Sequence, residues 1–266
     1  IRATLEPILA GRAHAFAFGM ADPESIADAA ADLESQGIRA AVVYRLFAYP
    51  WTFAERTRFI LGLDASVPTP MMGELPARLR SAIRFVDAGG YQDDPRIGRI
   101  LADRAREISQ DPAREAVLIL SHGSGSEAVE ARQQAVVARN IAEMQQRLAT
   151  PFAAVRATSL REDWPKKRTV AVKEIRTFMD RQRSLGRDVL IVSNRLLGEG
   201  PYRRYLGDGP YRMNGTGLLP HPLFTAIVKD RIAAALKILT GTHDRASSDS
   251  LTLTGEAGHL HPSGQP

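Results

Sequence analysis

A single histidine stands at the end of an apolar run in the middle of the chain. The run covers residues 116–120 (AVLIL) and is followed by SHGSG at residues 121–125. An unbroken run of Val, Leu and Ile is typical of a strand buried on both faces, and the Gly and Ser residues predict a tight loop before a helix. Ligands bind at this edge of open α/β sheets. His122 is therefore a candidate base or metal ligand, and the alternative is a polar loop residue that caps the strand.

The loop suggests three other functions, but for each of them a residue of the known motif is missing. Backbone N–H groups of residues 121–126 could hold an anion, although the loop is shorter than a Walker loop and lacks its Lys-Ser/Thr. A phosphoryl-transfer histidine would follow an arginine, but Ser121 precedes His122. Ser124 lacks the hydrolase elbow because His122 occupies the first glycine position. Of these, the anion-binding loop stays open as a third hypothesis.

Composition narrows the class of protein and the kind of site. The chain has 266 residues, of which 44% are hydrophobic and 24% charged, as in ordinary soluble globular proteins. No apolar run approaches the roughly 18–20 residues of a membrane span. The chain has no cysteine, which excludes disulfides, zinc–thiolate sites and thiol nucleophiles. Any metal ion would be held by His, Asp, Glu or Tyr.

The charge balance is basic without a basic stripe. The net charge is +5 and the pI about 9.7, yet charges of opposite sign alternate along the chain. No nucleic-acid partner is expected, because no run of Lys and Arg with interleaved aromatic residues occurs. A basic cleft for a polyanionic small molecule and a solvated Arg-rich surface both explain the excess.

Hydrophobic patterning predicts alternating strands and helices. Strands are expected at residues 14–19, 39–47, 84–86, 116–121, 152–158, 188–194 and 211–214. Helices are expected at residues 1–12, 23–36, 52–61, 95–109, 127–148, 165–184, 199–206 and 222–239. Asp94 and His221 each precede a helix-opening proline and are predicted to be N-caps. This alternation predicts an α/β fold with parallel sheets and right-handed crossovers.

The chain also repeats itself. Residues 84–104 and 212–231 each contain an Arg-apolar pair, a glycine loop, a proline at a helix start and Asp-Arg eight residues later. Residues 37–47 and 186–197 each end a strand in Arg-Leu, and Asp22-Pro23 has a counterpart in Asp163-Trp164-Pro165.

We therefore predict two similar halves, residues 1–110 and 111–240, and a disordered tail at residues 241–266. The first half lacks the opening strand and loop of the second. We expect the missing strand before Ile1.

The strand ending in His122-Gly123-Ser124, the duplicated half and the helix start LPHPL resemble the class II chelatases, and most closely the sirohydrochlorin/cobalt chelatase family. The resemblance covers most of residues 14–240 and is best in the second half. It implies two flavodoxin-like, three-layer α/β/α halves with a tetrapyrrole in the cleft between them. It also implies that His122 binds the incoming metal ion and helps to remove a pyrrole proton.

The resemblance suggests further site residues. Tyr202 stands where the family has a second histidine, and Glu162 is a displaced candidate for a family glutamate. Glu199 is a second candidate metal ligand beside His122. Glu162 is also a candidate second base, and Tyr202 is a candidate for substrate binding. The other candidates for substrate binding lie at strand ends and in the loop, and they are Arg45, Arg195, Ser121 and Ser124. The two arginines hold repeat-related positions and would grip carboxylates, with which Arg pairs through two hydrogen bonds.

The predicted activity is insertion of a divalent metal ion, Co²⁺ or Fe²⁺, into a sirohydrochlorin-like tetrapyrrole, in the biosynthesis of cobalamin or siroheme. The metal ion would be a substrate, and no organic cofactor is expected. The alternative is a non-catalytic carrier of a metal ion or tetrapyrrole that has lost the second histidine. The expected compartment is the cytoplasm, or the periplasm if a leader precedes Ile1. A homodimer is an open alternative to a monomer.

Overall fold

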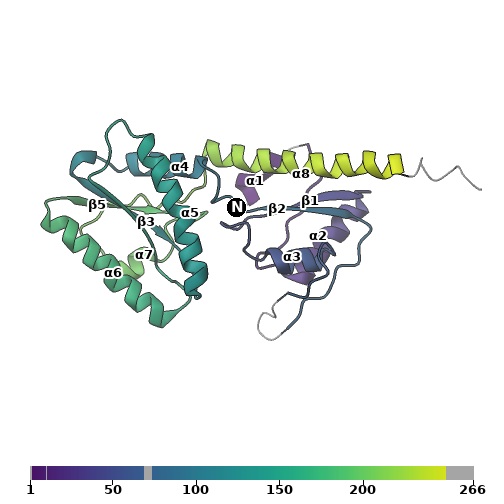
Figure 1. The fold of residues 1–266 in the computed structure, drawn as a ribbon, viewed down its shortest axis with the longest axis horizontal. Coiled ribbons are helices and arrows are strands. Elements are labelled where there is room, and N and C mark those ends of the chain that lie inside the picture. The colour runs from purple at the N-terminus through teal and green to yellow at the C-terminus, as the bar shows by residue number, and fades with distance from the viewer. Residues whose placement is uncertain (1, 10, 69–73, 250–266) are drawn as a thin grey trace, which may run out of the picture.

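The computed structural model describes residues 2–9, 11–68 and 74–249 and shows two lobes, each built on a parallel sheet (Figure 1). The N-terminal elements are α1 (Arg2–Leu9), α2 (Pro23–Ser35), β1 (Ala40–Arg45), α3 (Ala54–Ile60), β2 (Arg84–Gly89) and α4 (Arg96–Arg106). After a 3₁₀ turn at Pro112–Arg114 come β3 (Glu115–Ser121), α5 (Glu127–Gln146), β4 (Ala154–Ser159), α6 (Pro165–Ser184), β5 (Asp188–Ser193), α7 (Tyr202–Leu206) and α8 (Pro222–Asp249).

The C-terminal lobe is a three-layer α/β/α sandwich. Its sheet has the order β4-β3-β5 with both pairs parallel, and all seven residues of β3 are buried. Leu118 packs with apolar residues of α6 and α7, whereas Ile119 packs with those of α4, α5 and α8. Successive strand residues point to opposite faces, so a continuous apolar run is required when helices cover both. The predicted doubly buried strand and the three layers are confirmed.

The N-terminal lobe is smaller and less buried. Its described strands, β1 and β2, form a parallel pair whose register runs from Ala40 opposite Arg84 to Arg45 opposite Gly89. One face packs against α2 and α3, and Tyr44 on the other face joins the core that includes α8. Most of β1 is only half-buried.

The last helix of each half covers the sheet of the other half. The chain reaches α4 directly after β2, but α4 packs on α5 and β5 of the C-terminal lobe. In turn α8 follows the C-terminal lobe and extends over β1 and β2 (Figure 1). Arg84 of β2 donates a hydrogen bond to Leu239 O of α8 at 2.7 Å. The two lobes are therefore interlocked by their helices.

Equivalent arginines of the internal repeat, one on each of these helices, make equivalent contacts with the chain that leads into the other helix. Arg104 of α4 donates to Gly217 O at 2.9 Å and Pro220 O at 2.6 Å, in the loop before α8. Arg231 of α8 reaches the matching loop before α4, with Gly89 O at 3.5 Å and an Asp93 carboxylate oxygen at 2.8 Å.

Both predicted capping side chains accept hydrogen bonds at the helix starts, although the N-cap residue of α4 is Pro95 and not Asp94. Asp94 accepts from Arg96 N at 3.0 Å, and His221 Nδ1 accepts from Leu223 N at 3.2 Å. These equivalent side chains satisfy N–H groups that the first turn of a helix leaves unpaired.

Four predicted elements differ from the structure. Residues 14–19 form no strand, and residues 211–214 form a single bridge from Arg212 to Leu190. The helix expected at residue 199 begins at Tyr202, because Gly198 and Gly200 adopt positive φ and Pro201 follows. Helix α8 continues to Asp249, ten residues beyond the predicted end, and residues 250–266 of the predicted tail lie outside the described residues.

Candidate functional site

His122 lies directly after β3 with its ring partly exposed. Its Nδ1 is 2.9 Å from Gly123 O. Because a carbonyl oxygen only accepts, Nδ1 carries the proton in this hydrogen bond. The other nitrogen, Nε2, is 3.2 Å from Asp163 Oδ2 and 3.9 Å from Glu162 Oε2. In the neutral ring Nε2 therefore offers its lone pair beside two carboxylates, as a base or metal ligand requires.

The two carboxylates differ in their other partners. Both oxygens of Glu162 lie 2.5 Å from Arg195 Nη1, and the Glu162 side chain is only 9% exposed. Burial opposes the charge of Arg195, but the hydrogen bond and charge of Glu162 outweigh it and raise the pKa of Arg195. Asp163 is 70% exposed, and within the described residues its side chain has one ionisable partner, the His122 ring. Asp163 is thus the freer carboxylate for a ligand or proton.

The loop after His122 is held by a carboxylate of the chain itself. Glu130 of α5 accepts from Ser124 N at 2.8 Å and from Ser159 Oγ at 2.6 Å. Arg161 Nε lies 3.7 Å from the same carboxylate. Ser124 N, which an external anion would need, is therefore already occupied. This geometry disfavours the anion-binding alternative for residues 121–126.

Ser121 belongs to a buried chain of side-chain amides. Its Oγ accepts from Asn194 Nδ2 at 3.0 Å, and Asn194 Oδ1 accepts from Gln92 Nε2 at 3.0 Å. Gln92 O accepts from Asn140 Nδ2 of α5 at 2.9 Å. Ser121 and Asn194 are each exposed by less than a tenth, so the structure gives Ser121 a packing role, and its predicted contact with substrate has no geometric support. These hydrogen bonds link the loop after β2 to β3, the strand that precedes His122.

Tyr202 and Glu199 lie apart from His122. Tyr202 is fully buried and donates to Leu120 O at 2.8 Å. Burial raises the pKa of Tyr202, which keeps the phenol neutral. Glu199 accepts from Arg203 Nε at 3.1 Å, and no described contact joins it to His122. The geometry supports a packing role for Tyr202 on the sheet. The metal-binding role of Glu199 remains a prediction that this geometry does not support.

The two repeat-related arginines are both engaged by carboxylates. Arg45 forms an ion pair with Asp87 at 2.7 Å and donates to Thr52 O and Pro50 O, with only 7% of its side chain exposed. Arg195 holds Glu162 and keeps 29% of its side chain exposed. A substrate carboxylate could reach Arg195 far more easily than Arg45.

Sequence reasoning missed Asp163 and Trp164 as site residues. The N-cap residue of α6 is Trp164, which makes no side-chain cap bond, and the Asp163 side chain does not cap the helix. Asp163 is therefore free to face His122. The Trp164 ring lies edge-on to the His122 ring, with centroids 6.0 Å apart and planes at 89°. A Cβ on Gly125 would stand 2.2 Å from Trp164 Nε1, so the ring could not keep this position beside a larger residue. Gly125 was therefore the one feature of the sequence that could have indicated a close neighbour of this loop.

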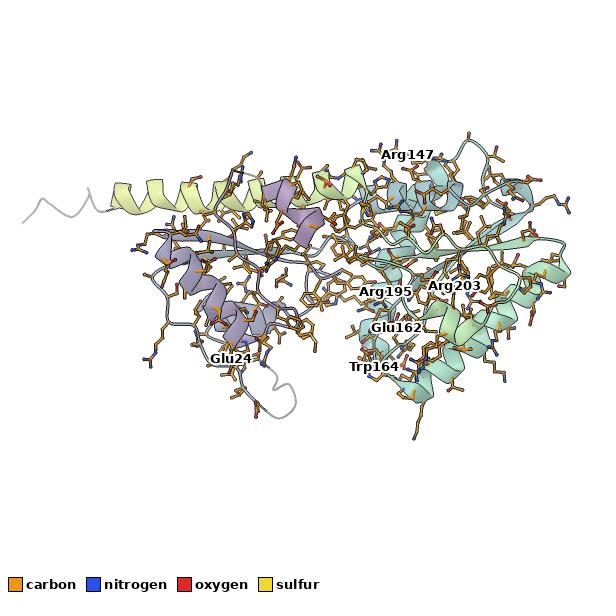
Figure 2. All side chains as sticks on the ribbon, turned by 180° about the vertical axis from the view of Figure 1, so that it is seen from behind. Glu24, Arg147, Glu162, Trp164, Arg195 and Arg203 are labelled. Atoms are coloured by element: carbon orange, nitrogen blue, oxygen red, sulfur yellow. The ribbon has the colours of Figure 1, made fainter. Side chains whose placement is uncertain are left out.

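Together, His122, Glu162 and Asp163 lie beyond the carboxyl ends of β3 and β4. Figure 2 shows Glu162, Trp164 and Arg195 on the side of this lobe that faces the N-terminal lobe. Within residues 2–9, 11–68 and 74–249, no group of three or more His, Asp and Glu side chains is arranged to enclose a metal ion. In the same ranges, no helix is both long and apolar enough to cross a membrane.

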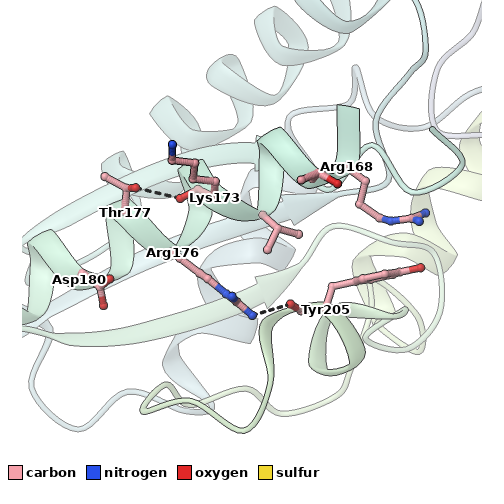
Figure 3. Close-up of a pocket in the computed structure, with 8 residues that line it drawn as sticks. Arg168, Lys173, Arg176, Thr177, Asp180 and Tyr205 are labelled. Carbon is pink, nitrogen blue, oxygen red and sulfur yellow. Dashed lines mark hydrogen bonds between the residues drawn. The ribbon is translucent and has the colours of Figure 1, made fainter. Parts of the chain in front are cut away.

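Two surface grooves lie elsewhere. Figure 3 shows one between α6 and α7, lined by Arg168, Lys173, Arg176 and Tyr205. Arg176 donates to Tyr205 O across it at 3.1 Å. A second groove lies beside Arg212, and neither groove is lined by His122.

Comparison with known proteins gives little beyond the fold. No protein-family model and no curated protein matches the chain. Among solved structures, the chain is similar to DR2241 of Deinococcus radiodurans, described as a multi-domain protein with structural similarity to chelatases and two additional novel domains. The identity is 19% and the TM-score 0.43, over 73% of this chain and 41% of the other. The chain thus spans less than half of that protein, and a likeness at this level identifies neither a family nor an activity.

Proposed function

We propose that this protein binds a divalent metal ion at His122 and inserts it into a tetrapyrrole. One observation carries the proposal. The Nδ1–H of His122 is fixed on Gly123 O, so Nε2 presents its lone pair to Asp163 and Glu162. Ligand atoms about 2.1 Å from one metal ion lie roughly 3.0–3.5 Å apart in octahedral or tetrahedral sites. The 3.2 Å from Nε2 to Asp163 Oδ2 falls in that range.

An open, weak site suits a metal ion that is a substrate. A durable site has about three or four protein ligands, whereas His122 and Asp163 supply two. The ion, Co²⁺ or Fe²⁺, would complete its coordination with water and then with pyrrole nitrogens. The partly exposed ring of His122 leaves room for such an exchange.

Insertion also needs acceptors for two protons. Each pyrrole N–H bond breaks with its electron pair left on nitrogen, and that pair forms the bond to the metal ion. His122 Nε2 accepts one proton once the ion has left it, and the exposed Asp163 accepts the other. Glu162 forms an ion pair with Arg195. In this proposal it orients the arginine toward the substrate and does not accept a proton. Arg195 binds one carboxylate of the tetrapyrrole, which we take to be sirohydrochlorin-like.

A carrier without turnover is the second candidate function. Arg45 is buried on Asp87 and Tyr202 is buried on Leu120 O, so the geometry gives no support to two of the predicted substrate contacts. A protein with one partly free arginine grips a polycarboxylate weakly. These contacts favour a chain that binds the metal ion or the tetrapyrrole and passes it on.

One assay separates the two functions. The purified chain is mixed with sirohydrochlorin and Co²⁺, and the absorbance change is compared with buffer alone. The enzyme predicts a faster conversion that His122→Ala reduces by about a hundredfold, whereas His14→Ala, outside the site, has no effect. No acceleration by the intact chain would sink the enzyme, and tetrapyrrole binding without turnover would establish the carrier.

Metal binding is measured separately by Co²⁺ titration. Asp163→Asn is expected to weaken Co²⁺ binding by about tenfold, because a ligand is lost while the fold is kept. Asp180→Asn serves as the matched control, since Asp180 is similarly exposed and contacts Arg183 and not His122. Equal weakening by both changes would contradict the assignment of Asp163.

A further inference from the structure

Strand β1 has a hydrogen-bonded neighbour on one edge. Arg39 O accepts from Arg84 N at 2.9 Å and Arg45 O from Gly90 N at 3.2 Å, so the odd-numbered residues face β2. Backbone groups of successive residues in a strand point to opposite edges. The N–H and C=O groups of Val42 and Tyr44 therefore point away from β2, where no strand of residues 2–9, 11–68 or 74–249 pairs with them.

The internal repeat identifies what covers the equivalent edge. In β5, Val189 O accepts from Arg212 N at 2.9 Å, as Arg39 O accepts from Arg84 N. On its other edge, Asn194 N donates to Leu120 O of β3 at 2.8 Å. Arg45 and Arg195 are repeat-related, so Tyr44 corresponds to Asn194. The open edge of β1 thus corresponds to the edge of β5 that β3 occupies.

Two flanking segments agree with this correspondence. Residues 14–19 precede Asp22-Pro23 as β4 precedes Trp164-Pro165, yet they join no sheet, whereas β4 pairs with β3. Helix α1 packs on α8 as α5 packs on α4. Helix α1 therefore holds a place on α8 like that of α5 on α4.

We propose that the open edge of β1 binds one parallel, extended segment that is apolar on both faces. This segment resembles residues 116–120, because α2 and α3 cover one face of the small sheet and α8 the other. Strand addition satisfies an exposed row of N–H and C=O groups that otherwise favours aggregation. This proposal goes beyond the metal chemistry and does not depend on it.

Residue-resolved hydrogen exchange of the 266-residue chain tests the open edge. The amides of Val42 and Tyr44 are expected to exchange about tenfold or more faster than those of Ala41 and Val43, which face β2. Equal protection of the four amides in dilute protein would overturn the proposal. Protection that rises with protein concentration would also overturn it, since a second copy would then cover the edge.

A peptide copied from residues 113–126 (AREAVLILSHGSGS) serves as the probe strand. Its addition is expected to slow exchange at Val42 and Tyr44 by about tenfold. A control peptide with Leu118→Asp and Leu120→Asp is expected to have no effect. Absence of protection by the first peptide, or equal protection by both, refutes a specific apolar strand.

A proline variant distinguishes docking from folding. Val42→Pro removes an N–H that points to the open edge, and proline is tolerated where a strand's N–H faces solvent. The variant is expected to keep the unfolding midpoint within a few degrees while losing peptide protection at Tyr44. Peptide protection at Tyr44 that survives in a folded Val42→Pro chain contradicts the proposal.

Discussion

The two lobes have the same plan but differ in how completely neighbours enclose their strands. Strand β3 lies between β4 and β5 with helices on both faces, and it is fully buried. Strand β1 has one paired edge and is mostly half-buried, and so is β4, the edge strand of the larger sheet. Burial in this molecule is therefore set by the neighbours of a strand more than by its own residues.

The exchanged helices show the same inequality. The Arg104 side chain is 8% exposed and reaches two backbone carbonyls, whereas Arg231 is 25% exposed and reaches one carbonyl and Asp93. Hydrogen bonds of a charged group gain strength when water is excluded. We therefore expect the hydrogen bonds of Arg104 to stabilise the contact between the lobes more than those of Arg231.

The paired arginines differ in a way that concerns function. Arg45 is enclosed with Asp87, while Arg195 reaches the surface with Glu162 beside His122. The repeat supplied an arginine at both strand ends, but one supports a loop and the other borders the candidate site. Equivalent position in a repeat therefore does not imply equivalent function.

The largest expected contrast concerns the matched valines Val192 and Val42. Val192 of β5 is 1% exposed and Val42 of β1 is half-buried. Val192→Ala is expected to lower the free energy of unfolding by about 2–3 kcal/mol, from lost burial plus a cavity, and Val42→Ala by about 1 kcal/mol. Urea unfolding followed by circular dichroism measures both. Equal losses would mean that β1 is enclosed as fully as β5.

The reciprocal arginines give the next contrast. Arg104→Met is expected to cost about 2 kcal/mol of unfolding free energy, because the carbonyls of Gly217 and Pro220 lose a charged donor in a buried place. Arg231→Met is expected to cost about 0.5 kcal/mol, since water can replace the more exposed guanidinium. Thermal unfolding of both variants checks the order, and a larger loss for Arg231→Met would reverse our ranking of the two contacts.

The smallest contrast is the pH response of the two helix caps. Burial and then the charge of Arg104 lower the pKa of His221 below its ordinary 6.5, with Asp103 opposing. The unfolded chain then binds more protons below about pH 6.5, so the free energy of unfolding falls as pH decreases through that value. Protonation also removes the Nδ1 acceptor of the Leu223 N–H.

The cap of α4 responds at lower pH. Burial raises the pKa of Asp94, but hydrogen bonds from Arg96 outweigh it and leave the pKa below 3.8, so its contribution is lost only as pH falls below that value. His221→Asn, which keeps a capping oxygen, is expected to flatten the loss of stability between pH 7 and 5. Asp94→Asn is the control and should leave that interval unchanged. An unchanged slope in His221→Asn would show that other groups dominate.

Local signals predicted most of the secondary structure. The run at residues 116–120 required a strand covered on both faces, and the prolines at positions 95, 165 and 222 located helix starts within one residue. These predictions succeed because periodicity and capping depend on residues near in sequence. Residues 14–19 failed for the complementary reason, since a strand needs a partner and this segment has none among the described residues.

The candidate site was predictable only in part. His122 and Glu162 were candidates from the sequence, and the structure places both at one end of the sheet, with Glu162 paired to Arg195. Asp163 was missed because its approach to His122 joins two segments that are distant in sequence. Partners across a sheet edge come from distant segments, and no spacing rule links residues 122, 163 and 195.

The sequence by itself determined the elements, the repeat and the histidine at the end of β3, because each depends on short-range pattern. Only the tertiary structure decided that α4 and α8 exchange lobes, that Arg45 and Tyr202 are enclosed, and that Asp163 meets His122. Burial and ion pairing arise between segments far apart in the chain, where packing and the exclusion of water select one set of neighbours. The loop after β3 thus keeps a histidine that sequence identified and gains its carboxylate partner from the fold.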